Sequence, residues 1–354
     1  MKIQIVTIHC IPNFGSIFQS YALVTYLCNQ GYRAELIDYR PSYYAKGRNA
    51  FKRLLGIVMN YSAYIRQHKK YEDFINAFLP KGEVYHTLEE LYEIPTEDTC
   101  FIVGGDQLWN NFHTCGRDDV YKLTFVSGCK KIAYGTSMGR NTFDKIELEE
   151  LAKKISDFYS IGLREQSTVW MFQPYTKVPI YHAADPVLLL GVEDYMKFIG
   201  KKRLIKEPYL VMYLAAKSEL LSRTVEYIAK RKGLKVVHVC GFKKKCKCDY
   251  FLKDTGPEEL LNLIYYSDFV VSASFHATLF SILFQKQFCT LLPEVGTNAR
   301  IEDLLSYFEL SERIIHNQSE IANVDLKINF ESTISIKNVL VSESKEQLLK
   351  AINS

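Results

Sequence analysis

One histidine stands where a strand-like run changes into a helix-like run. The stretch SASFHATLFS (272–281) places His276 at this change, two residues after Ser274. In a parallel α/β sheet such a position lies at the ligand-binding edge, and the N-terminus of the following helix favours an anion. An imidazole there could move a proton near neutral pH. Because a lone histidine is usually structural, these residues alone leave both interpretations open.

A glycine turn joins the first strand-like run to the first helical pattern. In NFGSIFQSYAL, Asn13, Gly15 and Ser16 stand at the start of a segment with apolar residues at helical spacing. Backbone N–H groups at the start of a helix suit an anion. A tight strand-to-helix connection explains the same residues equally well, because one glycine turn is not a phosphate-binding fingerprint.

A second turn, VGGDQLWN (103–110), has two glycines and an acid at a strand end. Gly104 and Gly105 would let another backbone or a ligand approach closely, which places Asp106 at the binding edge of the sheet. Asp106 could orient a sugar hydroxyl or act as a base, or it could cap the next helix. Trp109 could stack on a sugar, although core packing is the commoner use of tryptophan.

Two arginines stand at the ends of predicted elements, Arg164 where a strand ends and Arg300 where a helix begins. Arg164 in GLREQS is expected either to pair with an acid such as Asp185 or to bind a carboxylate or phosphate, since a guanidinium suits all of them. Asp185 in AADPVLLL is expected to cap a turn. Arg300 in TNARIEDLL begins a helix, where a cation opposes the helix dipole. Either a bound anion or an acidic neighbour would explain Arg300.

The stretch HVCGFKKKCKC (238–248) combines one histidine, three cysteines and four lysines. The cysteine spacing does not match a zinc ribbon or finger, so we predict no metal site. Lys244 and the neighbouring lysines are either solvated or help to hold a phosphate.

The composition is that of a globular protein. The chain has 354 residues, 47% of them hydrophobic and 24% charged, with a net charge of +4. This charge does not call for a nucleic-acid partner, and no apolar run is long enough to predict a membrane-spanning helix. The N-terminus lacks the pattern of a signal peptide, and the scattered cysteines are typical of reduced thiols. We therefore expect a cytoplasmic protein.

Short apolar runs alternate with helical patterns, which predicts an α/β fold with parallel sheets. Strands are predicted at 2–9, 34–39, 100–105, 131–137, 158–165, 178–183, 209–215, 235–240, 269–274 and 287–292. Helices are predicted at 16–32, 143–158, 217–232, 256–267 and from about 277. We expect two Rossmann-like domains facing across a cleft, at 1–200 and 201–354. The last helix is expected to return to the first domain.

Residues 40–70 form part of a basic helical insertion, expected over about 40–95, and contain no acid. An apolar stripe runs through them from Leu54 to Ile65. A surface helix packed on the core is one interpretation. The other is an interfacial helix that meets anionic lipid or a lipid-linked diphosphate, which would make the protein peripheral at the inner face of a membrane.

The ordered motifs resemble those of the polysaccharide pyruvyl transferase family. NFGSIFQSYAL resembles its N-[YF]-G-x-x-x-Q-x-Y-A-L, VGGDQLWN its V-G-S-D-Q-x-W-N, GLREQS its S-x-R-E-x-S, and DPVLLL its D-P-x-x-L-L. GPEELLNLIYYSDFVVSASFHATLFSILF and NARIEDLL resemble its C-terminal signature. The resemblance extends from residue 1 to about 310.

This resemblance implies a fold like that of GT-B glycosyltransferases and a specific reaction. A pyruvyl group would pass from phosphoenolpyruvate to two hydroxyls of a sugar, giving a cyclic ketal, with no metal or organic cofactor. It also implies that His276 is catalytic, that Arg164 and Arg300 contact the donor anion, and that Asp106 serves the acceptor. Many members have arginine in S-x-R-x-H where this chain has Ser274. Arg300 or the lysines near Lys244 are expected to replace that arginine, or else the donor differs.

Two other functions remain compatible with the sequence. One is a glycosyltransferase that uses a nucleotide sugar on the same scaffold, and the other is a non-catalytic homologue that binds glycan. The sequence specifies neither the acceptor sugar nor the oligomeric state.

Overall fold

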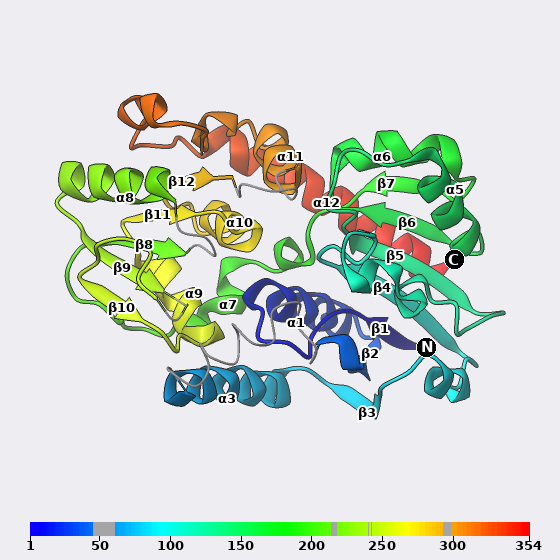
Figure 1. Ribbon diagram of the computed structural model, residues 1–354. Helices are drawn as coiled ribbons and strands as arrows, with labels where there is room; N and C mark the ends of the chain where they lie inside the picture. Colours follow the sequence, from blue (N-terminus) through cyan, green and yellow to red (C-terminus); the bar gives the residue numbers. More distant parts are fainter. Residues whose placement is uncertain (45–60, 214–217, 240, 242, 293–298) are drawn as a thin grey trace. The chain divides into compact units, whose positions relative to one another are not determined.

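The computed structural model describes residues 1–44, 61–213, 218–239, 241, 243–292 and 299–354 (Figure 1). They form two compact units. Unit 1 comprises Met1–Arg48, Phe74–Leu190 and Lys337–Ser354, and unit 2 comprises Asn49–Asp73 and Gly191–Ile336. The units thus divide at residue 190, whereas the sequence suggested 200. Part of the basic insertion groups with unit 2, and most of the last helix groups with unit 1.

Unit 1 contains a parallel seven-stranded sheet in the order β3-β2-β1-β4-β5-β6-β7. Its strands are β1 (Lys2–Val6), β2 (Arg33–Tyr39), β3 (Lys81–Tyr85), β4 (Thr99–Gly105), β5 (Lys130–Thr136), β6 (Ser160–Leu163) and β7 (Ile180–His182). The central strand β4 is buried along its whole length. Such continuous burial is expected of a parallel strand covered on both faces.

The helices of unit 1 follow the strands in the manner of α/β units. They are α1 (Phe14–Asn29), α4 (Thr114–Arg117), α5 (Lys145–Lys154) and α6 (Gln166–Phe172), with the 3₁₀ turns η1 (Ser42–Tyr44), η2 (Glu89–Glu93), η3 (Asp119–Lys122), η4 (Gln173–Tyr175) and η5 (Pro186–Leu189). Asn13 caps α1 by accepting a hydrogen bond from the Ser16 N–H at 3.1 Å. Gly31 follows the helix with φ of +87°, as predicted for its end.

Unit 2 contains a parallel six-stranded sheet in the order β10-β9-β8-β11-β12-β13. Its strands are β8 (Tyr209–Tyr213), β9 (Lys235–Val239), β10 (Tyr250–Leu252), β11 (Phe269–Ser272), β12 (Phe288–Leu291) and β13 (Ile314–Ile315). Its helices are α7 (Val192–Ile199), α8 (Glu219–Lys232), α9 (Pro257–Tyr266), α10 (Phe275–Leu283) and α11 (Ala299–Tyr307), with the 3₁₀ turns η6 (Ser311–Arg313) and η7 (Gln318–Asn323). The α/β class and the parallel sheets predicted from the sequence are confirmed in both units.

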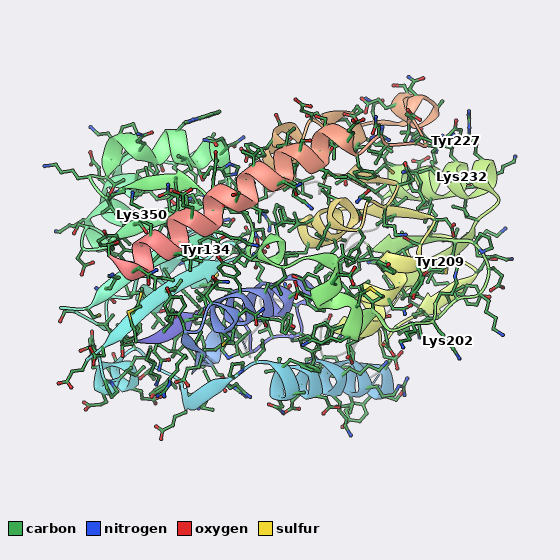
Figure 2. All side chains as sticks on the ribbon, turned by 180° about the vertical axis from the view of Figure 1, so that it is seen from behind. Tyr134, Lys202, Tyr209, Tyr227, Lys232 and Lys350 are labelled. Carbon is green, nitrogen blue, oxygen red and sulfur yellow. The ribbon has the colours of Figure 1, made fainter. Side chains whose placement is uncertain are left out.

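Two helices have residues in both units, namely α3 (Tyr61–Phe78) and α12 (Glu331–Asn353). Within unit 1, Ser344 of α12 accepts a hydrogen bond at its Oγ from the Ala184 N–H at 2.8 Å. Figure 2 shows this helix from behind, with Lys350 labelled near its end and buried Tyr134 of β5 labelled beside it. No helix among the described residues is both long and apolar enough to cross a membrane.

Candidate functional site

A cavity of about 410 Å³ lies within unit 1, where the loops after β1, β2 and β4 meet. The residues that line it are Ile8, Ile11, Asn13, Ser16, Tyr43, Tyr44, Asp106, Gln107, Phe112, His113, Thr114, Cys115 and Arg117. The carboxyl edge of a parallel sheet is the usual place for a ligand. Three residues singled out in the sequence, Asn13, Ser16 and Asp106, are therefore brought together here.

The predicted glycines act on the backbone around the cavity. A Cβ at Gly104 would lie 2.0 Å from the Tyr134 carbonyl oxygen, so Gly104 lets β4 and β5 approach closely. Gly105 has φ of +135°, a conformation that side-chain-bearing residues rarely adopt. Gly15 is buried in the first turn of α1. These three glycines support the fold and do not line the cavity.

Asp106 is held by an arginine from the neighbouring strand end. Arg164 Nη2 lies 2.7 Å from Asp106 Oδ1, Nη1 lies 3.0 Å from Asp185 Oδ2, and Nε lies 3.2 Å from Glu165 Oε1. Burial would lower the pKa of Arg164, but the three acids outweigh it and raise the pKa. The guanidinium thus stays charged and fixes Asp106. Of the two roles considered for Arg164, the geometry matches the structural partner of Asp185.

The other two acids extend this network through motifs that seemed separate in the sequence. Asp185 accepts a hydrogen bond from Gln19 Nε2 at 2.6 Å and caps η5 through the Val187 N–H at 2.9 Å, as predicted. Glu165 accepts from the Ser137 hydroxyl at 2.6 Å and the Met138 N–H at 3.1 Å. Side chains from five separate segments of the chain thus form one scaffold whose cavity-facing acid is Asp106. Asp106 is not a helix cap, because turns follow it.

Two tyrosines that sequence reasoning missed form part of the cavity wall. The Tyr43 hydroxyl donates to Asp118 Oδ2 at 2.8 Å, and the Tyr44 and Tyr121 hydroxyl oxygens lie 3.1 Å apart. Burial and the neighbouring tyrosine and acid raise the pKa of Tyr43 well above its usual value, so the phenol stays neutral. The only sequence signal was their place shortly after a predicted strand.

Trp109 packs in the core and does not line the cavity. Its side chain is buried, its Nε1 donates to the Tyr121 carbonyl oxygen at 2.7 Å, and its ring packs edge-on against Phe158. The stacking role considered for Trp109 is therefore wrong, because no face of the indole is exposed.

His276 lies in unit 2, in the first turn of α10 at the carboxyl end of β11. Ser274 begins the helix, with its hydroxyl oxygen accepting from the Ala277 N–H at 3.4 Å. The Ser274 N–H donates to Ser272 Oγ at 2.9 Å. The helix consequently starts at Phe275 and not near residue 277. His276 is 5% exposed, in a helix whose nine residues are all buried.

Phe275 connects His276 with an arginine from another helix. The Phe275 and His276 ring centroids are 5.1 Å apart, and Arg300 Cζ of α11 lies 6.0 Å from the Phe275 ring centroid. The structure therefore brings Arg300 into the neighbourhood of His276 through the aromatic residue between them. Ser274 serves here as the helix cap.

Lys244 is exposed on the loop after β9 in unit 2. Burial, together with the smaller effect of the charges of Lys245 and Lys244, lowers the pKa of His238 to about 4. The His238 ring stacks on Phe251 with centroids 4.7 Å apart. Cys240 lies outside the described residues. Within the described part of the chain, no three His, Cys, Asp or Glu side chains are grouped to hold a metal ion.

The model of one protein family, described as polysaccharide pyruvyl transferase, matches residues 13–293. The match includes the motifs around Asn13, Asp106, Arg164 and His276, and ends before Arg300. No curated protein gives a significant sequence match.

Solved structures share the fold at low sequence identity. UDP-GlcNAc 2-epimerase from Methanocaldococcus jannaschii is 14% identical, with a TM-score of 0.50, over 97% of this chain and 100% of that one. UDP-GlcNAc 2-epimerase from Neisseria meningitidis is 11% identical, with a TM-score of 0.52, over 100% and 94%. Trehalose 6-phosphate synthase from Burkholderia multivorans is 11% identical, with a TM-score of 0.51, over 99% and 96%. The predicted two-domain, GT-B-like α/β fold is confirmed.

Proposed function

The chain belongs to the polysaccharide pyruvyl transferase family, and on that premise we propose that it transfers a pyruvyl group from phosphoenolpyruvate to a sugar. The acceptor would be part of a cell-surface polysaccharide or of its lipid-linked precursor. Two sugar hydroxyls would become bridged in a cyclic ketal. The observation that carries the proposal is the grouping of His276, at a strand-to-helix junction, with Arg300 across Phe275.

His276 is assigned the role of general acid. Protonation of the methylene carbon of phosphoenolpyruvate makes C2 electrophilic, and imidazole is the side chain most often used for such a transfer near neutral pH. Arg300 would bind the carboxylate or phosphate of the donor and stabilise the leaving phosphate, replacing the arginine that Ser274 does not supply. Lys244 would add positive potential from its loop.

The acceptor is assigned to the cavity of unit 1. Asp106 would orient a sugar hydroxyl or remove its proton, supported by the fixed guanidinium of Arg164 at 2.7 Å. Asn13 and Ser16 line the same cavity and offer polar groups for other hydroxyls. In this assignment Arg164 acts through Asp106 and does not touch the donor.

The reaction balances without a cofactor or metal. The first hydroxyl oxygen bonds to C2 while C3 gains a proton, which gives a phosphorylated ketal. The C2–O bond to phosphate then breaks, and inorganic phosphate leaves. The second hydroxyl oxygen bonds to C2 and closes the ring. Two hydroxyl protons are released, one taken up at C3 and one by the leaving phosphate.

Thermal unfolding in the presence of candidate donors tests the proposal. We expect phosphoenolpyruvate to raise the Tm of the wild-type protein and to lose this effect in Arg300→Ala. Arg223→Ala removes an exposed arginine of α8, paired with Glu219, and is the matched control that should keep the effect. Stabilisation by UDP- or CMP-sugars alone would contradict the proposal and favour a glycosyltransferase.

A lipid-linked acceptor would bring the protein to a membrane surface. Leu54 and most of the predicted apolar stripe lie outside the described residues. Its last members, Tyr61 and Ile65 of α3, are 63% and 45% exposed. We expect the protein to float with vesicles that contain anionic lipid at low salt, and less so at high salt because ions screen the attraction. Equal flotation with neutral vesicles would rule out a charge-driven contact.

A further inference from the structure

Phe112 is a large aromatic side chain left exposed at the cavity of unit 1. It is 65% exposed and lines the cavity, whereas Trp109, three residues earlier, is fully buried. A single exposed aromatic residue is ordinary on a protein surface. Phe112 differs from such a residue in two ways. It lies beside a polar cavity, and another side chain holds its ring in place.

That support is the guanidinium of Arg140. Arg140 Cζ lies 3.9 Å from the Phe112 ring centroid and 4.1 Å from that of Phe143, so the guanidinium is held between two rings. Arg140 is 7% exposed and bonded to the Glu147 carboxylate and the Thr142 carbonyl oxygen. One face of the Phe112 ring is therefore fixed, while much of the side chain remains exposed. A ring fixed in this way loses little entropy when a ligand stacks on it.

The turn that carries Phe112 is held by its own side chains. Gln107 has φ of 55°, a left-handed conformation that is uncommon outside glycine. Its Oε1 accepts from Asn110 Nδ2 at 2.8 Å and lies 3.0 Å from His113 Nε2. The Phe112 N–H donates to Asn110 Oδ1 at 3.1 Å. Uncommon backbone conformations held by such contacts are frequent at binding sites.

The lining of the cavity has the chemistry that a sugar ring requires. Phe112, Tyr43 and Tyr44 offer apolar ring surface, and Asp106 and Asn13 offer hydrogen-bonding groups. A pyranose has a C–H face and a rim of hydroxyls, so it can contact both kinds of surface at once. A pocket that combines apolar ring surface with a few convergent polar groups is typical of small-ligand sites.

We propose that Phe112 is the stacking surface for the acceptor sugar, held by Arg140 at the cavity that contains Asp106. This inference rests on the proposed function for its expectation of a sugar acceptor. It assigns to Phe112 the contact that the sequence suggested for Trp109. A phosphate or another small anion would not require the ring, so the inference commits to a saccharide.

Saturation-transfer NMR with the full chain and a panel of methyl glycosides tests the inference. The panel comprises the methyl glycosides of galactose, mannose, glucose and N-acetylglucosamine, without phosphoenolpyruvate. We expect at least one to bind, with the strongest transfer to the C–H protons of one ring face. Phe112→Ala should weaken that binding about five- to tenfold, and Phe112→Tyr should retain it, because an aromatic contact is worth roughly up to that factor.

Phe143→Ala is the matched control, because it removes the other ring on Arg140 but not the one at the cavity. It should change glycoside binding by about twofold at most, well below the effect of one lost aromatic contact. Absence of binding to the wild-type protein, unchanged binding in Phe112→Ala, or equal loss in Phe112→Tyr would overturn the inference. The glycosides are tested without the donor, so this result is independent of the thermal-unfolding test with phosphoenolpyruvate.

Discussion

Asp106 and His276 are held by different kinds of structure. Asp106 depends on side chains: it bonds to Arg164, which also bonds to Asp185 and Glu165. His276 depends on its helix: Ser274 caps α10, and the helix is buried along its length. A side-chain network fixes the position of an acid, but replacing any one member removes hydrogen bonds from the others. A buried helix can lose one side chain at its first turn and keep its position.

The largest effect should follow from replacing His276. We expect His276→Gln to lower the rate of phosphate release from phosphoenolpyruvate about 10²–10⁴-fold, the range for loss of a general acid. The Tm should stay near that of the wild-type protein, because the cap and the helix packing remain. A fall in Tm large enough to explain the lost rate would contradict the catalytic role, since His276 would then be a structural residue.

The second effect separates two of the three acids that bond to Arg164, namely Asp185 and Asp106. Asp185→Asn should destabilise the protein by about 3 kcal/mol in denaturant unfolding, because loss of one partner weakens a buried ion-pair network. Asp185 does not line the cavity, so the folded fraction should keep most of its activity.

Asp106→Asn should show the opposite pattern, with the rate reduced about 10²-fold as a base is lost and with a smaller loss of stability. Asp106 is 17% exposed at its side chain, whereas Asp185 is 1% exposed. Equal effects of the two substitutions on rate and stability would contradict the division between cavity-facing and supporting acids.

The smallest effect concerns a second buried network in unit 1. Burial would raise the pKa of Asp38, but hydrogen bonds from His9 and Arg40 lower it below its usual range. Since the folded pKa is lowered, the stabilisation is present above the unfolded pKa of about 4 and is lost as pH falls from there through the folded pKa.

Urea unfolding between pH 2 and 6 measures this loss. The free energy of unfolding should fall with pH below about 4 in the wild-type protein, and less steeply in Asp38→Asn. Parallel pH profiles for the two proteins would show that Asp38 is not the group responsible.

The sequence predicted the inner strands of each sheet and the edge strand β7, but not the other three edge strands. β3, β10 and β13 lie at sheet edges and were missed. β3 and β10 have no fully buried residue, and β13 has only two residues. Edge strands have an uncovered side and are often short or polar, so they lack the continuous apolar run that marks a central strand. The start of α10 was placed too late because Ser274 was not identified as its cap.

The site was predictable where strand ends bring motifs together. Topology alone places Asp106 and Asn13 at the same edge of a parallel sheet, and both line one cavity. Phe112 could not be found in this way, because the guanidinium that packs on its ring comes from Arg140, 28 residues later in the chain. The sequence could not choose between the uses of Trp109 either, since burial of an indole depends on tertiary packing. The catalytic role of His276 stays a prediction.

Isotope incorporation tests the central claim most directly. Phosphoenolpyruvate and the panel of methyl glycosides are incubated with the protein in deuterium oxide, and products are analysed by mass spectrometry and NMR. We predict a cyclic ketal whose methyl group carries one deuterium from the solvent, with one phosphate released per acceptor consumed. Phosphoenolpyruvate left intact in the presence of every glycoside, or a ketal methyl group without deuterium, would contradict the proposed reaction.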